Sequence, residues 1–337
     1  SIGILISSVV GFLHILFVFL VYRKSSGRKE QLKNQDRGQH IFRMLMGTAL
    51  PFMIYALLGR GILLLDGILF IRQKEGTADT VLLWGNYYGK CLPVLGIMIL
   101  FCILFHEGYI RRIIYFMDRE EFRMARERMA EFMQHIILIS FPVAVFTAVF
   151  SENLLNLFFK GNNAPLAQAV STGSILIPLF AISYACAELL VRMRKMRYVL
   201  SLEGIAAITH GILMIVLLQS MGDSLFGILV AQIVPLAVFT VLSFILVLRG
   251  IQYRIDYMRR LAFPAATAAA AGLVCLAFNK LLSSFAGSTV SMIICIPVGI
   301  VIYIILLLIL KAISEDEIQK LPLAGMILFI GKLTRLL

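Results

Sequence analysis

The stretch that decides the fold is LPFMIYALLGRGILLLDGILFI, residues 50–71, which is apolar apart from two charged residues. At ~1.5 Å per residue, a helix of this length measures roughly 33 Å, and the hydrocarbon core of a bilayer is about 30 Å thick. The stretch therefore predicts a membrane-spanning helix with Arg60 near its middle and Asp66 about two turns nearer the far end. A charge at that depth normally faces a helix bundle or an aqueous cavity, so both residues are candidates for function.

The composition extends this prediction to the whole chain. Of its 337 residues, 60% are hydrophobic and 15% are charged, and the mean hydropathy is +0.92. These values exclude an ordinary soluble domain. A window of about 19 residues predicts spans at 1–22, 43–71, 81–110, 131–158, 166–191, 200–220, 224–248, 261–282 and 288–312. We therefore expect an all-α, polytopic transmembrane helical bundle of about nine spans.

The basic residues predict the orientation of this bundle. The formal net charge is +12, and most of the 31 lysines and arginines lie after the first predicted span, within 111–128, 192–197 and 249–260, or in the tail. Short cytoplasmic loops retain such residues, so we expect residue 1 outside and the C-terminus in the cytoplasm, in the cytoplasmic membrane. An odd number of spans beginning outside predicts further helices before residue 1. Topology and attraction to anionic membrane lipids account for the charge, and no nucleic-acid partner is expected.

Polar segments divide the chain into five predicted parts. The first is a helix at 1–22. RKSSGRKEQLKNQDRGQH, residues 23–40, is rich in Gly, Ser, Gln and Asn and predicts a basic cytoplasmic linker. Six helices at 41–250 would form a lobe, followed by two additional helices at 251–313. The tail at 314–337 opens with Ser314 before an acidic run, a helix-start pattern, and predicts an amphipathic helix along the cytoplasmic interface.

Proline follows an apolar residue in most of the predicted spans. The pairs are Leu50-Pro51, Leu92-Pro93, Phe141-Pro142, Ile177-Pro178, Val234-Pro235, Phe263-Pro264 and Ile296-Pro297. A proline within a helix removes one backbone donor and kinks the helix. Kinked helices around a polar cavity suit a transporter that rocks between two states, although proline is also commoner in membrane helices generally.

Three charged residues are the predicted binding residues. Arg60 and Asp66 are separated by about 120° around a helix, so each needs its own partner. Arg60 can contact an anion such as a phosphate or form a structural salt bridge. Asp66 can bind a cation or proton, or pair with Lys90. Lys90 lies beside Trp84, Tyr87 and Tyr88, which resemble an interfacial aromatic belt, and snorkelling to the outer headgroups is its favoured role.

Other polar residues have structural interpretations. Glu188 and Arg192 are spaced for a pair within one helix. His14 and His210 lie towards the middle of the membrane, where a hydrogen-bonded packing role is favoured over a proton relay. His106, Glu107, Gln134 and His135 cluster at cytoplasmic helix ends and fit either a gate or interfacial solvation. The five scattered cysteines are expected to be small buried hydrophobes. Enzymatic and nucleotide motifs are absent, so we expect neither an enzyme nor a cofactor, and an ion gradient, the membrane potential or the substrate gradient would drive any transport.

Three segments carry a resemblance to a known family. They are FRMLMGTALPFMIYALLGRGILLLD (42–66), MARERMAEFMQHIILISFPVAVFTAVFSENLLNLFF (124–159) and ISEDEIQKLPLAGMI (313–327). The chain resembles the C-terminal part of the multidrug/oligosaccharidyl-lipid/polysaccharide exporter superfamily, in its polysaccharide biosynthesis branch, which includes stage V sporulation protein B and the lipid II flippases. The resemblance lies in helix pattern and degenerate motifs, and implies the second six-helix lobe of a two-lobe transporter plus two extra helices.

The resemblance also implies a function. Such a protein moves a lipid-linked anionic saccharide from the inner to the outer leaflet by alternating access, and Arg60 resembles, by position, an arginine that engages the pyrophosphate. Two alternatives stay open. A cation-coupled multidrug efflux antiporter would use Asp66 and is disfavoured by the central arginine. In a membrane scaffold without transport activity, Arg60 would be a structural bridge.

Overall fold

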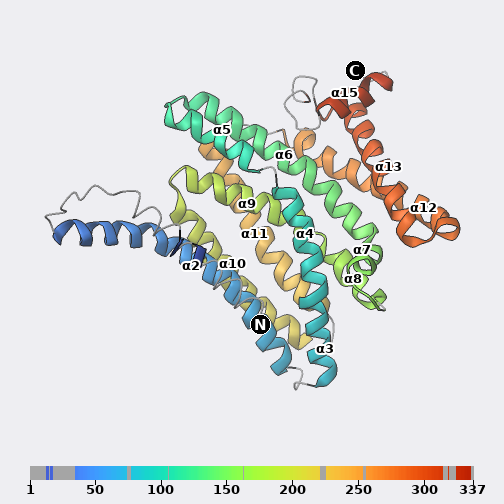
Figure 1. Ribbon diagram of the computed structural model, residues 1–337, viewed down its shortest axis with the longest axis horizontal. Coiled ribbons are helices and arrows are strands. Elements are labelled where there is room, and N and C mark those ends of the chain that lie inside the picture. Colours follow the sequence, from blue (N-terminus) through green and yellow to red (C-terminus); the bar gives the residue numbers. More distant parts are fainter. Residues whose placement is uncertain are drawn as a thin grey trace. The chain divides into compact units, whose positions relative to one another are not determined.

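The computed structural model describes residues 13, 14, 16, 17, 35–73, 77–104, 106–161, 163–220, 225–252, 256–313, 318 and 324–334. All regular structure within these residues is helical, which confirms the all-α class (Figure 1). The chain divides into two compact units, Ser1–Phe52 and Met53–Leu337. The first unit holds the beginning of α2 (Gln35–Gln73), and the second holds all the other labelled helices.

Eight helical segments are long and apolar enough to cross a membrane, so this is a multi-pass membrane protein. Their bounds are Ala49–Arg72, Ala78–Ile103, Phe122–Val149, Ala164–Arg192, Met196–Ser220, Leu225–Ile251, Met258–Phe285 and Ser288–Ile309. The first predicted span, 1–22, lies outside the described residues except at four positions. Because successive spans cross in opposite directions, the connections around residues 104–121, 193–195 and 252–257 share one side, which we call the basic side.

The helices that form these spans are joined by short connections. The second span comprises α3 (Ala78–Asn86), the π-helical turn η1 (Tyr87–Cys91) and α4 (Leu92–Ile103). After α5 (His106–Asp118), the remaining elements are α6 (Phe122–Val149), α7 (Ser151–Phe158), α8 (Ala164–Gly173), α9 (Leu176–Arg192), α10 (Met196–Ser220), α11 (Leu225–Ile251), η2 (Met258–Ala262), α12 (Phe263–Ala286), α13 (Ser288–Ile309) and α15 (Ala324–Leu333).

Several predicted boundaries were wrong. The span predicted at 81–110 ends at Ile103, and α5 follows as a separate helix that buries Tyr109, Ile110 and Ile113 while exposing Arg111 and Arg112. The span predicted at 131–158 begins at Phe122, because the arginine-rich start of α6 continues the same helix beyond the apolar segment. The last residues of the predicted linker, 35–40, already belong to α2. Most of the predicted tail lies outside the described residues, and α15 forms its described part.

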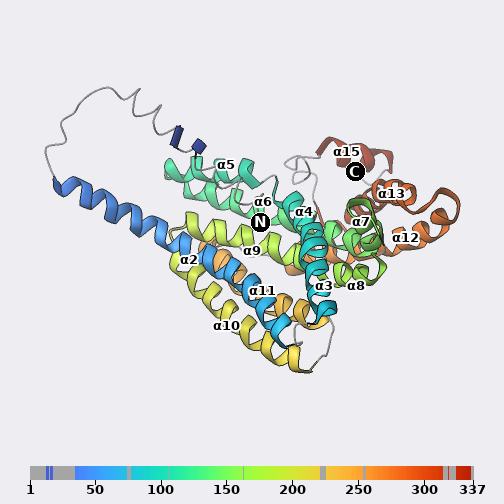
Figure 2. The ribbon, with the colours of Figure 1, turned by 60° about the horizontal axis from the view of Figure 1, so that its bottom comes forward.

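The core of the second unit forms around α6 and α9, the most buried of the spans. Figures 1 and 2 both show these two helices side by side, and α9 also packs on α11. The α12–α13 hairpin packs against α6 through glycines. A methyl group at Gly272 would overlap the side chain of Val145 of α6, and one at Gly299 would lie 2.9 Å from the ring of Phe146 of α6. Glycine is therefore what allows these backbones to approach so closely.

The apolar-proline pairs have definite structural effects. Leu92-Pro93 and Phe263-Pro264 each come directly after a π-helical turn, η1 and η2. A proline within an α-helix also leaves the carbonyl four residues earlier without its usual donor. Pro142 frees the carbonyl of Leu138 in this way, and the Tyr303 hydroxyl of α13 donates to that oxygen at 3.0 Å. Neighbouring helices thus supply the missing donor, as a membrane interior requires.

All five cysteines are free and buried, which confirms their interpretation as small hydrophobic residues.

Candidate functional site

Asp66 lies on the one narrow stripe of α2 that is buried. Among the described side chains of this helix only Asp66, Gly67 and Phe70 are buried, whereas apolar neighbours such as Leu64 and Leu65 are 70% and 57% exposed. Asp66 itself is 1% exposed. A carboxyl group so deeply buried needs hydrogen-bond partners, because burial without them costs several kcal/mol.

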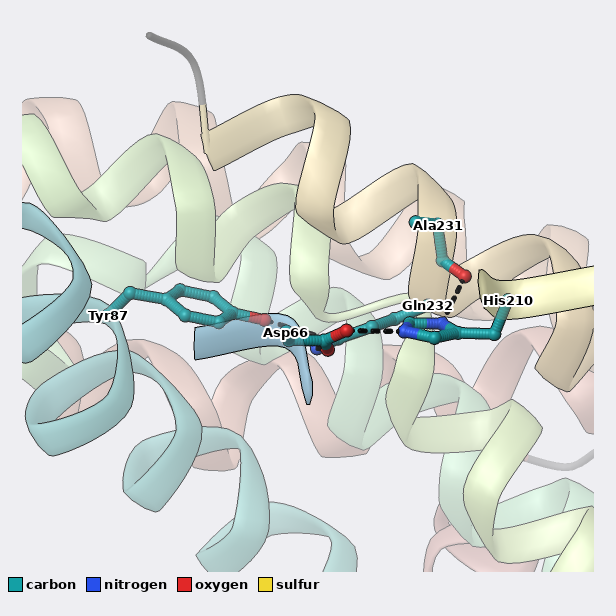
Figure 3. Close-up of polar contacts among 5 residues, drawn as sticks. All are labelled: Asp66, Tyr87, His210, Ala231 and Gln232. Carbon is teal, nitrogen blue, oxygen red and sulfur yellow. Dashed lines mark hydrogen bonds and ion pairs between the residues drawn. The ribbon is translucent and has the colours of Figure 1, made fainter. Parts of the chain in front are cut away.

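Residues from α10 and α11 supply those partners (Figure 3). His210 Nε2 lies 2.6 Å from Asp66 Oδ1, and Gln232 donates through Nε2 to Asp66 Oδ2 at 3.3 Å. Tyr87 of η1 donates its hydroxyl proton to Gln232 Oε1 at 2.8 Å. We refer to Asp66, Tyr87, His210 and Gln232 as the polar cluster. It connects four membrane spans through side chains alone.

The polar cluster lies inside the membrane, in the half away from the basic side. Each residue can be placed by counting from the nearest end of its span on that side. The span ends on that side are Arg72, Ala78, Ser220 and Leu225. At ~1.5 Å per residue, the four residues of the polar cluster lie about 9 to 15 Å from these ends. The agreement among four helices indicates that the cluster occupies one level of the bilayer, within the hydrocarbon region.

Pro235 of α11 positions His210. Because Pro235 has no backbone N–H, the carbonyl of Ala231, four residues earlier, has no intrahelical donor from it. His210 Nδ1 lies 2.7 Å from this oxygen. A carbonyl only accepts, so Nδ1 carries a hydrogen and the imidazole ring is fixed with Nε2 towards Asp66. The Val234-Pro235 pair therefore creates the acceptor that orients the histidine.

A π-helical turn positions Tyr87. Within η1 the bonding shifts to the residue five positions earlier, so Leu92 N–H donates to the Tyr87 carbonyl just before Pro93. Tyr87 and Cys91 of this turn are fully buried. The hydroxyl of Tyr87 fixes Gln232 with its amide oxygen towards the tyrosine and its NH2 group towards Asp66. Single π-turns within α-helices are frequent at functional sites.

An aromatic group covers the cluster on the α3 side. The ring of Trp84 lies 5.8 Å from Phe70 and 5.7 Å from Tyr87, measured between centroids. A methyl group added at Gly67 would lie 3.0 Å from Trp84 Nε1, so the indole rests directly on α2 next to Asp66. The predicted belt is thus only partly correct: Tyr88 is exposed, but Tyr87 is a buried member of the polar cluster.

The predicted pairing of Asp66 with Lys90 was wrong. Lys90 Nζ instead donates to Asn163 Oδ1 at 3.1 Å. Asn163 is 1% exposed and donates to Asn156 Oδ1 and the Phe159 carbonyl. Lys90 therefore holds η1 against the connection between α7 and α8. Arg60 lies in α2, but its side chain is outside the part of the structure that is described.

The remaining polar predictions have mixed outcomes. Arg192 pairs with Glu188 at 2.6 Å, as the spacing predicted. His106 packs edge-on against Phe132, and both of its ring nitrogens lack a hydrogen-bond partner among the described residues. Burial, with a smaller contribution from His135, lowers the pKa of His106 to about 3. Gln134 instead accepts from Arg260. The side chain of Glu107 lies outside the described part of the structure.

Sequence reasoning did not bring His210, Tyr87 and Gln232 together. His210 was expected to be a hydrogen-bonded packing residue, and the structure confirms that it is buried and hydrogen-bonded. Tyr87 was assigned to the aromatic belt, and Gln232 was not singled out. A signal was present for two of them, because His210 is a histidine at mid-membrane and Gln232 is a polar residue three positions before Pro235 in an apolar helix. Nothing local in the sequence indicates that these two residues meet Asp66.

A cavity of about 240 Å³ lies one helical turn from the cluster. Leu83 of α3, Gln168 and Thr172 of α8 and Leu229 of α11 contribute to its lining. Leu83 precedes Tyr87 by one turn, and Leu229 precedes Gln232 by nearly one turn, so the cavity is on the side away from the basic loops. Within the described residues, no group of three His, Cys, Asp or Glu side chains is placed to hold a metal ion.

No family model, curated protein or solved structure matches this chain. The geometry of the polar cluster is therefore the main support for a function, together with the resemblance in helix pattern.

Proposed function

We propose that this protein is a membrane transporter that moves a lipid-linked anionic saccharide across the cytoplasmic membrane by alternating access. The observation that carries the proposal is the polar cluster, in which a 1% exposed carboxyl group at membrane depth joins four spans. Ionisable residues inside membranes are costly and usually mark a transport pathway or its coupling machinery. A rigid scaffold would be held at least as well by apolar packing at this position.

The attachment of α2 also supports a moving part. Its buried stripe consists of Asp66, Gly67 and Phe70, and its other described side chains are partly or fully exposed. Because few of its described side chains are buried, we infer that the polar cluster decides whether α2 is docked on α10 and α11. Alternating access requires such a two-state element.

The substrate class rests on chemistry and on the resemblance. Arg60 is placed near the middle of the α2 span, where a guanidinium group stays charged and binds phosphate oxygens in pairs. The segments 42–66, 124–159 and 313–327 resemble exporters of lipid-linked saccharides. A pyrophosphate-linked lipid supplies the anion that an intramembrane arginine would need.

Native mass spectrometry with Arg60→Ala tests the proposal. The protein is purified from its own membranes, in the wild-type form and as Arg60→Ala, at equal folded yield. Arg72→Ala is the matched control, because Arg72 lies in the same helix but is exposed at its end. We expect a pyrophosphate-linked lipid on the wild type and on Arg72→Ala, and its loss from Arg60→Ala. The same pyrophosphate-linked lipid on all three proteins would overturn the role of Arg60. Only bulk phospholipid on all three would overturn the substrate assignment.

A cation-coupled drug antiporter is the second candidate, and the buried Asp66 favours it. In proteoliposomes, an antiporter would use an imposed gradient of the coupling cation to accumulate a lipophilic cation. It would not require a pyrophosphate lipid. Uptake of such a cation, together with the absence of any bound pyrophosphate lipid, would favour this candidate.

A further inference from the structure

The hydrogen atoms in the polar cluster can be counted from geometry. His210 Nδ1 faces the Ala231 carbonyl, which has no proton to give, so Nδ1 carries a hydrogen. His210 Nε2 then faces Asp66 Oδ1 at 2.6 Å. Without a proton between them, two lone pairs would meet at this distance. One proton must therefore lie between Nε2 and Oδ1, either on an imidazolium next to a carboxylate or on a carboxylic acid next to a neutral imidazole.

Both arrangements carry no net charge. With its proton the pair is neutral, and each polar atom of Asp66 has a partner, since Gln232 donates to Oδ2. If the proton leaves to a water molecule, Asp66 is an anion beside a neutral imidazole that has no hydrogen to offer through Nε2. The side chains of His210 and Asp66 are 7% and 1% exposed, so this negative charge would be buried with the Gln232 amide as its only donor among the members of the polar cluster. Such a state costs several kcal/mol and favours separation and hydration of the pair.

The surrounding charged and titratable groups do not replace that proton. From η1, Lys90 is bonded to Asn163, and Tyr87 uses its hydroxyl proton for Gln232. From α11, the pair meets the Gln232 amide and a backbone carbonyl. The groups nearest to the pair along the packed elements are Cys91 of η1, Glu203 about two turns away on α10, and Arg72 at the exposed end of α2. Arg60 precedes Asp66 by six residues on α2, and its side chain is outside the described part of the structure. Glu203 lies near Gly59, towards the basic side.

We propose that Asp66 and His210 together bind a single proton, and that release of this proton undocks α2 from α10 and α11. The proton passes to water in the cavity beside Leu83 and Leu229, and its return re-forms the Nε2–Oδ1 bond and docks the helix again. The inference deepens the proposed function, on which it rests, by naming the proton as the ion that drives the transport cycle.

Trp84 is a built-in reporter for the docked helix. It is the only tryptophan of the chain, and its indole contacts Gly67 and Phe70 on α2. Undocking removes these contacts and exposes the indole, which shifts its emission. Only the pH is varied. The protein is held in lipid nanodiscs, and the emission of Trp84 is recorded from about pH 4 to 9, the range in which carboxyl and imidazole groups ordinarily titrate.

The decisive variant is Asp66→Asn. An asparagine amide can donate to the neutral imidazole at Nε2 while its oxygen accepts from Gln232, so the bonds of the docked state persist without the extra proton. Asp79→Asn is the matched control, because Asp79 is exposed at the start of α3, near Trp84 in the sequence. We expect a single sigmoidal change of emission in the wild type and in Asp79→Asn, and a constant emission in Asp66→Asn.

A second measurement covers the case in which Asp66→Asn does not fold. In that case His210→Gln is the test variant. The glutamine amide donates to the Asp66 carboxylate at every pH, so the emission transition of the wild type should be displaced or lost in this variant. A constant emission in the wild type, or an unaltered transition in every folded variant, would overturn the inference. Failure of the transport proposal is recognised separately: the transition is present, but no pyrophosphate-linked lipid binds. Lipid transport at the wild-type rate in Asp66→Asn would overturn proton coupling and leave the transport function standing.

Discussion

Removal of the Tyr87 hydroxyl provides a quantitative test of the polar cluster. Tyr87 is fully buried and donates one hydrogen bond of 2.8 Å, to Gln232 Oε1. Tyr87→Phe keeps the ring and its contact with Trp84 but removes this bond. Side-chain hydrogen bonds within membrane proteins contribute about 0.6 kcal/mol on average and up to about 1.7. We expect Tyr87→Phe to lower the free energy of unfolding by an amount in that range, towards its upper end because the group is fully desolvated.

A double-mutant cycle separates this bond from other effects of the substitution. In a Gln232→Leu background the Tyr87 hydroxyl has no acceptor, so its removal should cost nothing or even stabilise the protein. The expected coupling energy between the two positions is therefore about 0.6 to 1.7 kcal/mol. Reversible unfolding in mixed micelles, followed through the emission of Trp84, measures all four proteins under the same conditions.

Tyr88→Phe is the matched control for this cycle. Tyr88 is the next residue along the chain and also stacks near Trp84, at 6.3 Å between centroids, but its side chain is 54% exposed. Its free energy of unfolding should stay within about 0.5 kcal/mol of the wild type. An equal cost of Tyr87→Phe with and without Gln232 would refute the hydrogen bond and, with it, the assigned orientation of the amide towards Asp66.

Two further predictions concern the packing of α12 and the basic side. Gly272→Ala places a methyl group against Val145 Cγ1 and should cost about 1 to 3 kcal/mol by overpacking. Gly96→Ala, with no atom within 4 Å of the added methyl group, should not carry this cost, and equal melting temperatures of the two variants in detergent would contradict the prediction. Burial lowers the pKa of His106 from 6.5 to about 3, so the unfolded chain binds a proton within this window that the folded chain does not. Stability should therefore be independent of this group above pH 6.5 and fall by up to about 1.4 kcal/mol per pH unit below it. His106→Phe should flatten the acid limb of a stability-against-pH curve, and an unchanged slope would contradict the burial effect.

The fold class, the approximate position of the spans and the two charged residues within the apolar stretch of α2, Arg60 and Asp66, follow from the sequence alone. Hydrophobic runs long enough to cross a bilayer satisfy their backbone hydrogen bonds locally as helices, whatever their neighbours are. The same local reasoning placed the Glu188–Arg192 pair and the buried cysteines. Boundaries were less well predicted, because α6 continues as one helix into the arginine-rich segment before it, where hydropathy falls.

Only the tertiary structure decided which polar residues meet. Asp66, Tyr87, His210 and Gln232 are far apart in the chain, and three helix pairings must form before their side chains converge. Sequence reasoning offered Lys90 as one alternative partner of Asp66, since both lie towards the same end of their spans, yet it could not specify helix rotation. The rotation depends on packing, on the π-turn before Pro93 and on the carbonyl that Pro235 frees for His210. The sequence determines that a charge is buried in the membrane, and the packing of the helices determines its partner.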